Sequence, residues 1–289
     1  MSTQITTAFV KQYHDTIYML VQQQGSLLRG TVRNETQKGE FQFFDCVGST
    51  TAVKRTSRHA DTEYTSTPHS RRRVTLVDYD WADLIDKPDK VKMLIDPTST
   101  YNTNAQWAMG RAMDDEIIAA ALGTAYTGVD GSTSVTFATE GQAYTGASGA
   151  TLDLADLTST RRLFRAAEVQ DNETLHIIIT AKQLEALLNI STLTSADYNS
   201  VKALVAGEIN TFLGLNFKTS QRLSGATTAT CYCLAYAESG MLLSVGEDIE
   251  ARVDVLPTKK YSTQVFVSMG IGAMRMEGAK VISIVCKDD

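Results

Sequence analysis

The chain has 289 residues, a formal net charge of −6, 43% hydrophobic residues, and only four cysteines and four prolines. This apolar fraction is enough for a packed core and excludes a disordered or fibrous chain. No run of about 18 apolar residues is present and the N-terminus lacks the pattern of a secretory signal, so we expect no membrane partner. The mild negative charge argues against a dedicated nucleic-acid-binding protein. Four cysteines are too few for a disulfide framework, which predicts synthesis in a reducing, intracellular place.

Residues 1–40 are typical of a polar arm with one helical patch. Tyr13, Ile17, Leu20 and Val21 have the spacing i, i+4, i+7, i+8, which places them on one apolar stripe of a helix. The segment that follows is polar and interrupted by glycine, so the helix cannot extend far. No later element is predicted to cover the stripe. We therefore expect Tyr13, Ile17 and Leu20 to contact another subunit.

Residues 41–80 predict two strands joined by a long excursion. Phe41 and Phe43 alternate with Gln42, and a second strand surrounds Val74. About twenty mostly polar residues separate the strands, a length that is usually functional or disordered. This region holds a basic cluster: Lys54, Arg55, Arg58, Arg71, Arg72 and Arg73. An acidic tract follows directly: Asp78, Asp80, Asp83, Asp86 and Asp89. Adjacent blocks of opposite charge can pair within a chain or between chains.

The acidic tract does not predict a metal site. Its spacing lacks the glycine turn and the terminal glutamate of a calcium loop. We interpret it as a strand end followed by aspartates at the N-terminus of a helix. The best helix is predicted over 104–122, with Thr103 and Gln106 as a capping box and Gly123 as the stop. It should lie across a sheet.

The second half of the chain predicts an α+β fold. Helices are expected at 153–169, after Thr180 (which opens a second capping box), and at 196–209. Strands are expected at 175–180, 215–223, 229–236, 249–256, 261–276 and 280–286. Cys231 and Cys233 should lie buried on one face of a strand rather than bind zinc. Four scattered histidines and a GIGAMR segment without a following helix predict no catalytic site, no cofactor and no metal.

This order of elements resembles the major capsid protein of tailed bacteriophages, which has the Hong Kong 97 fold. Three passages carry the resemblance: a helix, LG and strand passage at 201–223, a strand and helix passage at 231–255, and closing strands with GAMR at 263–284. The resemblance implies an N-terminal arm (1–40), an E-loop (41–80), and a P-domain (81–149) with a spine helix at 104–122. It also implies an A-domain (150–255) and strands that return to the P-domain (256–289).

The resemblance also implies a function. The chain would self-assemble into hexamers and pentamers of an icosahedral shell enclosing double-stranded DNA, without sequence-specific DNA binding. It would be made in the host bacterial cytoplasm and reside in the virion, with scaffolding, portal and decoration proteins as further partners. No helical segment of about 100 residues precedes the arm, so a separate scaffolding protein, or none, is expected. In this family the E-loop lies across the adjacent subunit, so the basic cluster would pair with Asp83, Asp86 and Asp89 of a neighbour.

Two alternatives remain open from the sequence. An encapsulin-like nanocompartment shell would share the fold and enclose a cargo enzyme. A soluble α+β enzyme would use the carboxylates of Asp78, Asp80, Asp83 and Asp86. A covalent Lys–Asn crosslink through Lys54 is not expected, because an isolated lysine in a basic loop is usually just a charge.

Overall fold

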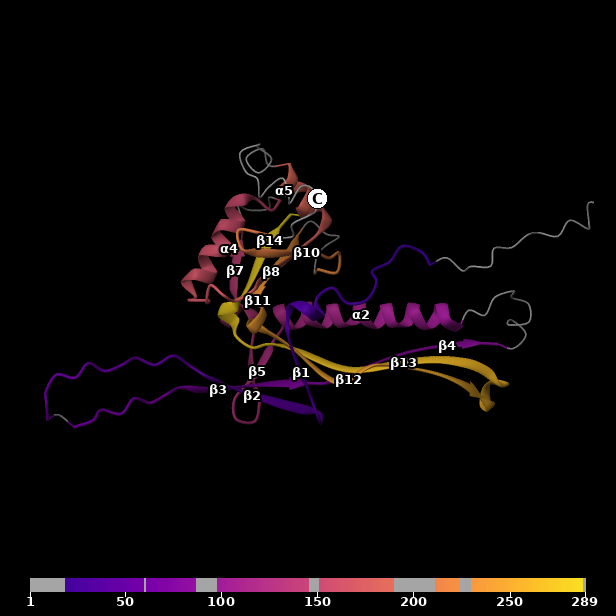
Figure 1. Cartoon of the computed structure of the whole chain (residues 1–289), viewed down its shortest axis with the longest axis horizontal. Helices are drawn as coiled ribbons and strands as arrows, with labels where there is room; N and C mark the ends of the chain where they lie inside the picture. The colour runs from indigo at the N-terminus through magenta and orange to yellow at the C-terminus, as the bar shows by residue number, and fades with distance from the viewer. Residues whose placement is uncertain are drawn as a thin grey trace, which may run out of the picture.

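The computed structural model describes residues 19–59, 61–86, 98–145, 151–189, 211–223 and 230–287. Three sheets organise this part of the chain. Figure 1 shows a compact unit above, a long sheet with a long helix running to one side, and a thin extended loop running to the other. None of the described helices is long and apolar enough to cross a membrane.

The long sheet has four strands in the order β1-β12-β13-β4: β1 (Arg33–Thr36), β12 (Met241–Leu256), β13 (Ser262–Arg275) and β4 (Val77–Ile85). Helix α2 (Thr98–Leu122) packs on one face of this sheet. Residues spaced by four give α2 its buried side: Ala105, Met109, Met113, Ile117 and Ala121. They face Val267, Met269 and Ile271 of β13 in the same core cluster. The helix therefore lies across a sheet, as the sequence predicts.

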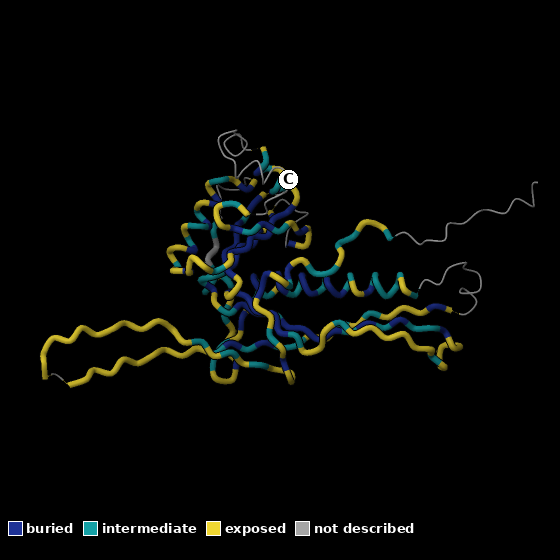
Figure 2. Tube along the Cα trace, in the orientation of Figure 1, coloured by how far each residue is buried: buried dark blue, intermediate teal, exposed yellow. Residues whose placement is uncertain are grey.

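A second sheet, which we call the loop sheet, carries the projection. Its strands are β2 (Phe41–Val47), β3 (His69–Thr75), β5 (Ala125–Thr127) and β6 (Thr133–Val135), all antiparallel. Between β2 and β3 the chain leaves the body as the extended loop, residues 48–68. The backbone N–H of Gly48 donates to the carbonyl of Pro68 at 2.8 Å and closes its neck. Every described residue of this loop is exposed, as Figure 2 shows.

The compact unit is built on a six-stranded sheet. Its order is β7 (Gln142–Thr145), β14 (Val281–Cys286), β11 (Cys231–Ala237), β8 (Leu175–Ile179), β10 (Leu215–Thr219) and β9 (Thr211–Phe212). Helices α4 (Leu154–Ala166) and α5 (Ala181–Leu188) belong to this unit, and the short helix α3 (Phe137–Glu140) precedes β7. All five residues of β8 are buried, as expected for a central strand.

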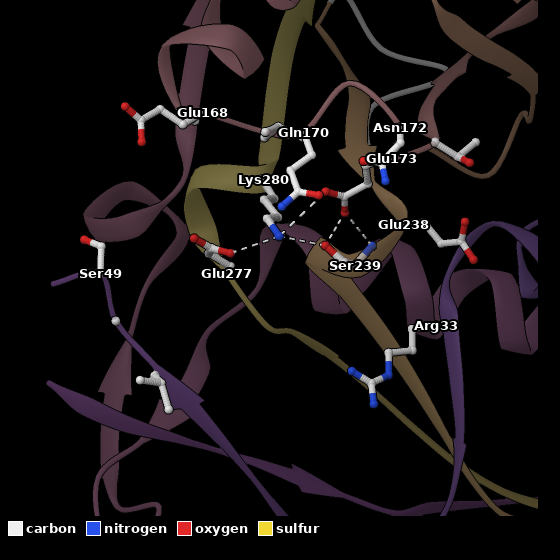
Figure 3. Close-up of a pocket in the computed structure, with 15 residues that line it drawn as sticks. Arg33, Ser49, Glu168, Gln170, Asn172, Glu173, Glu238, Ser239, Glu277 and Lys280 are labelled. Atoms are coloured by element: carbon white, nitrogen blue, oxygen red, sulfur yellow. Dashed lines mark hydrogen bonds and ion pairs between the residues drawn. The ribbon is translucent and has the colours of Figure 1, made fainter. Parts of the chain in front are cut away.

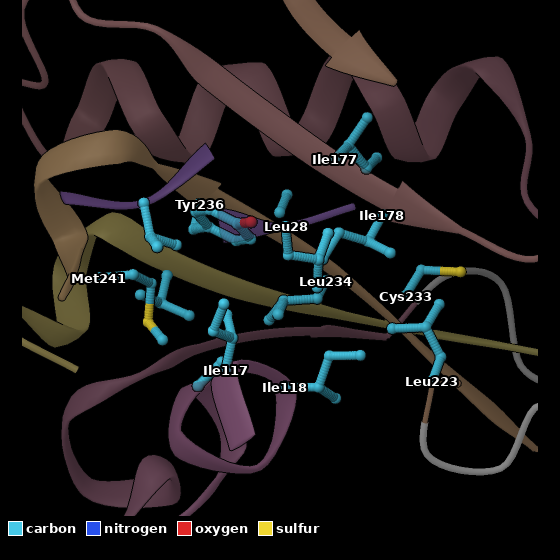
Figure 4. Close-up of a cluster of buried hydrophobic side chains, with 14 of the residues drawn as sticks. Leu28, Ile117, Ile118, Ile177, Ile178, Leu223, Cys233, Leu234, Tyr236 and Met241 are labelled. Carbon is cyan, nitrogen blue, oxygen red and sulfur yellow. The ribbon is translucent and has the colours of Figure 1, made fainter. Parts of the chain in front are cut away.

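The long sheet and the six-stranded sheet share one hydrophobic core. Figure 4 shows Leu28, Ile117 of α2 and Tyr236 of β11 in one buried cluster. The hydroxyls of Tyr236 and Thr31 are hydrogen-bonded at 2.5 Å, which satisfies both polar groups inside this core. A short 3-10 turn, η2 (Arg29–Thr31), precedes β1. Three others connect successive strands from β11 to β14: η3 (Glu238–Gly240), η4 (Pro257–Lys259) and η5 (Gly278–Lys280).

Several predicted boundaries are wrong. Helix α2 begins at Thr98 rather than Asn104, and the Thr103 hydroxyl donates to the carbonyl of Ser99 at 3.0 Å instead of capping a terminus. Threonine can make this i−4 bond inside a helix, so a capping pattern alone does not fix a start. Of the acidic tract, Asp78, Asp80 and Asp83 lie in strand β4 rather than at a helix N-terminus. Asp86 lies just after the strand, and Asp89 lies outside the described residues. The helix expected within 231–255 is absent, because η3 joins two strands there.

The sheets cross the predicted domain ranges, which stay a prediction. Strand β12, expected with 150–255, belongs to the long sheet. Of the strands expected to return together over 256–289, β13 lies in the long sheet and β14 in the six-stranded sheet. The predicted helix at 196–209 lies outside the described residues. In the compact unit, the side chain of Thr180 caps α5 as expected, by accepting from the N–H of Gln183.

Candidate functional site

The extended loop presents basic side chains far from the body of the chain. Lys54, Arg55 and Arg58 are all exposed. Arg55 donates to the carbonyls of Ser57, at 2.8 Å, and Arg58, so its bonds stay within the loop. In Figure 1 this loop and the far end of β4 project in opposite directions. A single chain therefore cannot bring the loop tip to that acidic strand.

The three consecutive arginines of β3 have partners within the chain. Arg71 binds the carboxylate of Asp45 through two donors, and this hydrogen bond lowers the pKa of Asp45. Arg72 is buried and binds both carboxylate oxygens of Glu140, at 2.7 and 2.6 Å. Arg71 and Arg72 thus each have a carboxylate partner within the chain, and their contact with a neighbour's aspartates stays a prediction. Within the basic cluster, Lys54, Arg55, Arg58 and Arg73 make no ion pair with a carboxylate of the described residues.

Arg73 is stacked between aromatic rings. Its guanidinium lies 5.0 Å from the ring centroid of Phe41 and 4.8 Å from that of Tyr126, while Arg71 lies 5.5 Å from Phe43. These five side chains lie on one side of the loop sheet, because the register places Arg73 opposite both Phe43 and Tyr126. We call this surface the arginine–aromatic face.

The arginine–aromatic face is open to solvent. Phe41 is 44% exposed, and Phe43 and Tyr126 are each 41% exposed. The opposite side of the loop sheet is covered, since Val74 is buried against Leu242 and Met274. The alternation at Phe41 and Phe43 correctly predicts a strand, but the sequence does not reveal that the phenylalanine side is the open one. Aromatic and arginine side chains dominate the energetics of protein interfaces.

Strand β4 carries the acidic residues along an open sheet edge. It pairs only with β13 in the described sheet order. Asp78 and Asp80 lie opposite Gly270 and Ser268 on one face, and Asp83 lies on the other. Asp86 accepts a hydrogen bond from the hydroxyl of Ser262 at 2.5 Å and so has a role within the chain. Asp89 lies outside the described residues.

The segment just before β1, residues 23–28, is fastened to helix α2 by one buried carboxylate. Asp114 accepts hydrogen bonds from Gln23 Nε2 and Ser26 Oγ, both at 2.5 Å, and from the N–H groups of Leu27 and Leu28 at 3.0 and 3.1 Å. Four donors satisfy the charge that burial would otherwise disfavour. This aspartate was not singled out from the sequence, and an acidic residue on the buried stripe of a helix is the signal that could have found it.

The close approach of this segment to the helix depends on glycine. A Cβ at Gly110 would lie 2.5 Å from the carbonyl carbon of Gly25. Beyond this point, Leu20 and Val21 are not helical and are exposed, at 89% and 107%. The predicted helical stripe therefore does not include Leu20, while Tyr13 and Ile17 lie outside the described residues. The exposure of Leu20 leaves it available to a neighbour.

A polar cavity of about 790 Å³ lies where the extended loop meets the compact unit. Figure 3 shows Lys280 at its centre, with its Nζ 2.8 Å from Ser239 Oγ, 3.3 Å from Glu277 Oε2 and 3.7 Å from Glu173 Oε2. Glu173 also accepts from the N–H and hydroxyl of Ser239. The network ties η3 to η5 and to the turn before β8. The network therefore braces this junction.

The residues weighed for metal or catalytic chemistry are dispersed. Among the described residues, no group of three histidine, cysteine or acidic side chains could hold a metal ion. Cys231 and Cys233 are buried, as expected. His176 is buried beside Tyr236, and burial followed by nearby Lys218 lowers its pKa. In the described part of the chain, these histidine, cysteine and acidic side chains therefore do not come together in one reaction site.

Comparisons with solved structures show which known proteins share the fold of this chain. The capsid structure of cyanophage P-SCSP1u matches with a TM-score of 0.75 and 16% identity, covering 100% of this chain and 96% of that chain. The acid-stable capsid structure of Helicobacter pylori bacteriophage KHP30 matches with a TM-score of 0.74 and 10% identity, covering 100% and 98%. A structure from Mycobacterium phage Che8 matches with a TM-score of 0.71 and 18% identity, covering 96% of each chain.

These likenesses confirm the α+β, Hong Kong 97-type fold expected from the sequence. A comparison with curated proteins finds no significant match. The family profile described as phage capsid protein matches residues 5–288. The chain therefore belongs to the phage capsid protein family.

Proposed function

We propose that this chain is the major head subunit, which assembles into hexamers and pentamers of an icosahedral shell around double-stranded DNA. The observation that carries the proposal is the extended loop. Its described residues are exposed throughout, and it leaves the body in the direction opposite to the long sheet. A loop of this length with so few contacts to its own chain is usually functional.

The charges favour a head-to-tail contact between copies. Lys54, Arg55 and Arg58 would lie along strand β4 of the neighbour, near Asp78, Asp80 and Asp83. A contact that joins two different surfaces of identical chains generates rings when the rotation closes. Exposed ion pairs contribute only about 0.2–1 kcal/mol each, so these would fix the register and guide encounter.

Apolar burial would supply most of the affinity. The arginine–aromatic face offers three half-exposed rings, and Leu20 and Val21 add an apolar patch near the arm. Removing apolar surface from water contributes about 25 cal/mol per Å². We propose that both patches are covered by neighbouring subunits. The arm residues Tyr13 and Ile17 remain candidates for the same contact.

The family membership bears on the two alternatives. Phage capsid proteins are structural, so a soluble enzyme using Asp78, Asp80, Asp83 and Asp86 is set aside. An encapsulin-like shell with protein cargo has no particular observation in its favour. Residence in the virion follows from the family. Synthesis in the host cytoplasm, packaged DNA, and scaffolding, portal and decoration partners are part of our proposal.

Electron microscopy of the purified full-length protein, with sedimentation, tests the proposal. We expect closed shells, tubes or capsomer rings. Reversing the loop charges (K54E, R55E and R58E together) should abolish them while leaving the thermal unfolding curve unchanged. Adding D78K, D80K and D83K to that variant should restore assembly, since the pairs are recreated with opposite polarity. Normal particles from the loop variant alone would overturn the proposed contact, and particles filled with protein would favour the nanocompartment.

A further inference from the structure

Three of the four cysteines lie together in the compact unit. Cys231 and Cys233 come from β11, and Cys286 comes from the neighbouring strand β14. All three side chains are on one face of the six-stranded sheet, because the register pairs Cys231 with Cys286 and Cys233 with Ile284. Their exposed fractions are 0%, 0% and 2%. Figure 4 shows Cys233 among the buried hydrophobic residues.

The thiol of Cys233 interacts with both of the other thiols. Hydrogen bonds with Cys231 and Cys286, followed by burial, raise the pKa of Cys233 well above its usual range. Cys286 Sγ is also 3.9 Å from the carbonyl of Ile284. The sulfurs therefore face a common space between β11 and β14. Packing alone requires only small apolar side chains at these positions, so the gathering of thiols calls for another explanation.

The register fits a disulfide between Cys231 and Cys286. Directly opposed residues of antiparallel strands have Cα atoms about 4.5–5.5 Å apart. Disulfides bridge Cα atoms about 4.4–6.8 Å apart. Cys231 and Cys233 are two residues apart on one strand, and Cys233 lies diagonally from Cys286, so the opposed pair has the best geometry.

We propose that Cys231 and Cys286 are an oxidisable pair, which closes into a cross-strand disulfide after the protein leaves the reducing cell. Each thiol loses its proton and one electron, and the two sulfurs form one bond. Dioxygen accepts the two electrons and two protons and becomes hydrogen peroxide. The bond locks β14 to β11 and closes the chain between them into a covalent loop.

The physical consequence is a more stable compact unit outside the cell. A disulfide removes conformations from the unfolded chain, and the gain increases with the length of the closed loop. The thiols are buried, so the reaction should be slow with dioxygen alone. Their reduced state during synthesis would leave folding unrestricted. The reaction belongs to the single chain and does not depend on the proposed assembly.

Diamide oxidation of the full-length protein tests the proposal. The N=N bond of diamide accepts the two thiol hydrogens, which converts diamide to a hydrazine. In a non-reduced tryptic digest we expect peptide 223–252 linked to peptide 281–287, because the cleavage sites follow from the sequence. The linked peptides should form in the wild type, C46A and C233A, but not in C286A. The thermal midpoint should rise by about 5 °C and return after reduction.

A variant with only the opposed pair makes the test decisive even if C286A folds poorly. C46A/C233A retains Cys231 and Cys286, so diamide should remove both remaining thiols as measured by titration of the unfolded protein. Two titratable thiols after treatment would overturn the proposal. So would a link that forms in the wild type and is lost in C233A, since that would place the bond on the diagonal pair.

Discussion

Buried arginines show how single side chains hold distant segments together in this chain. Arg275 is fully buried, and its guanidinium donates to the carbonyls of Ala121 at 2.8 Å, Gly123 at 3.0 Å and Val135 at 3.4 Å. It lies 5.3 Å from the ring centroid of Phe137, and burial lowers its pKa. The carbonyls at the end of α2 have no partner within the helix. One side chain from β13 satisfies the carbonyl of Ala121 in the last turn and that of Gly123, the residue after the helix.

Replacing this arginine should be costly. R275A leaves buried carbonyls without donors and a cavity, so we expect a loss of about 3–5 kcal/mol in the free energy of unfolding. Urea unfolding followed by circular dichroism measures it. R252A is the matched control, because Arg252 is exposed and pairs with nearby Glu250 at 2.7 Å. It should leave the free energy of unfolding nearly unchanged, because exposed ion pairs contribute little to stability. Equal losses from the two variants would contradict this role.

At the scale of elements, strand β4 is joined to helix α2 by a hydrogen bond with a clear pH signature. The Tyr79 hydroxyl donates to Glu116 Oε2 at 3.0 Å. Burial, followed by the charge and hydrogen bond of Glu116, raises the pKa of Tyr79 to about 12. The folded state therefore holds this proton more tightly than the unfolded chain, whose tyrosines titrate near pH 10.

The sign of the pH dependence follows from this difference. The contribution of Tyr79 to stability is complete below about pH 10 and is lost as the pH rises through the folded value near 12. Unfolding midpoints measured from pH 8 to 12 should fall more steeply for the wild type than for Y79F. Y126F is the control, since Tyr126 is partly exposed on the loop sheet. Parallel curves for the wild type and Y79F would refute the assignment.

At the scale of the whole molecule, folding and assembly should depend on different residues. The described residues of the extended loop are all exposed, so the body does not need them. Replacing residues 50–66 with two glycines should shift the thermal midpoint of the soluble protein by less than about 2 °C, because exposed loops contribute little to stability. The same variant should form no particles by sedimentation. A large loss of stability would mean that the loop packs on its own chain.

The sequence predicts local structure better than long-range placement. Alternation identifies β2, and the buried run 175–180 and the Thr180 cap are read correctly because these signals depend on near neighbours. The burial of Arg72, Arg275 and Asp114 could not be predicted, because their partners lie far along the chain. Which side of β2 faces solvent could not be predicted either. It depends on which face of the loop sheet meets Leu242 and Met274.

The pairing of the first described strand with a late one has a consequence for how the protein is made. β1 pairs in parallel with β12, so Asn34 lies beside Leu243, and the side chain of Gln37 accepts from the hydroxyl of Ser244 across 207 residues. Arg29 and Asp248 are joined across 219 residues. Contacts of such high sequence separation slow folding. The N-terminal part must therefore wait, exposed on the ribosome, until most of the polypeptide has been translated, and the native subunit can form only after synthesis is nearly complete.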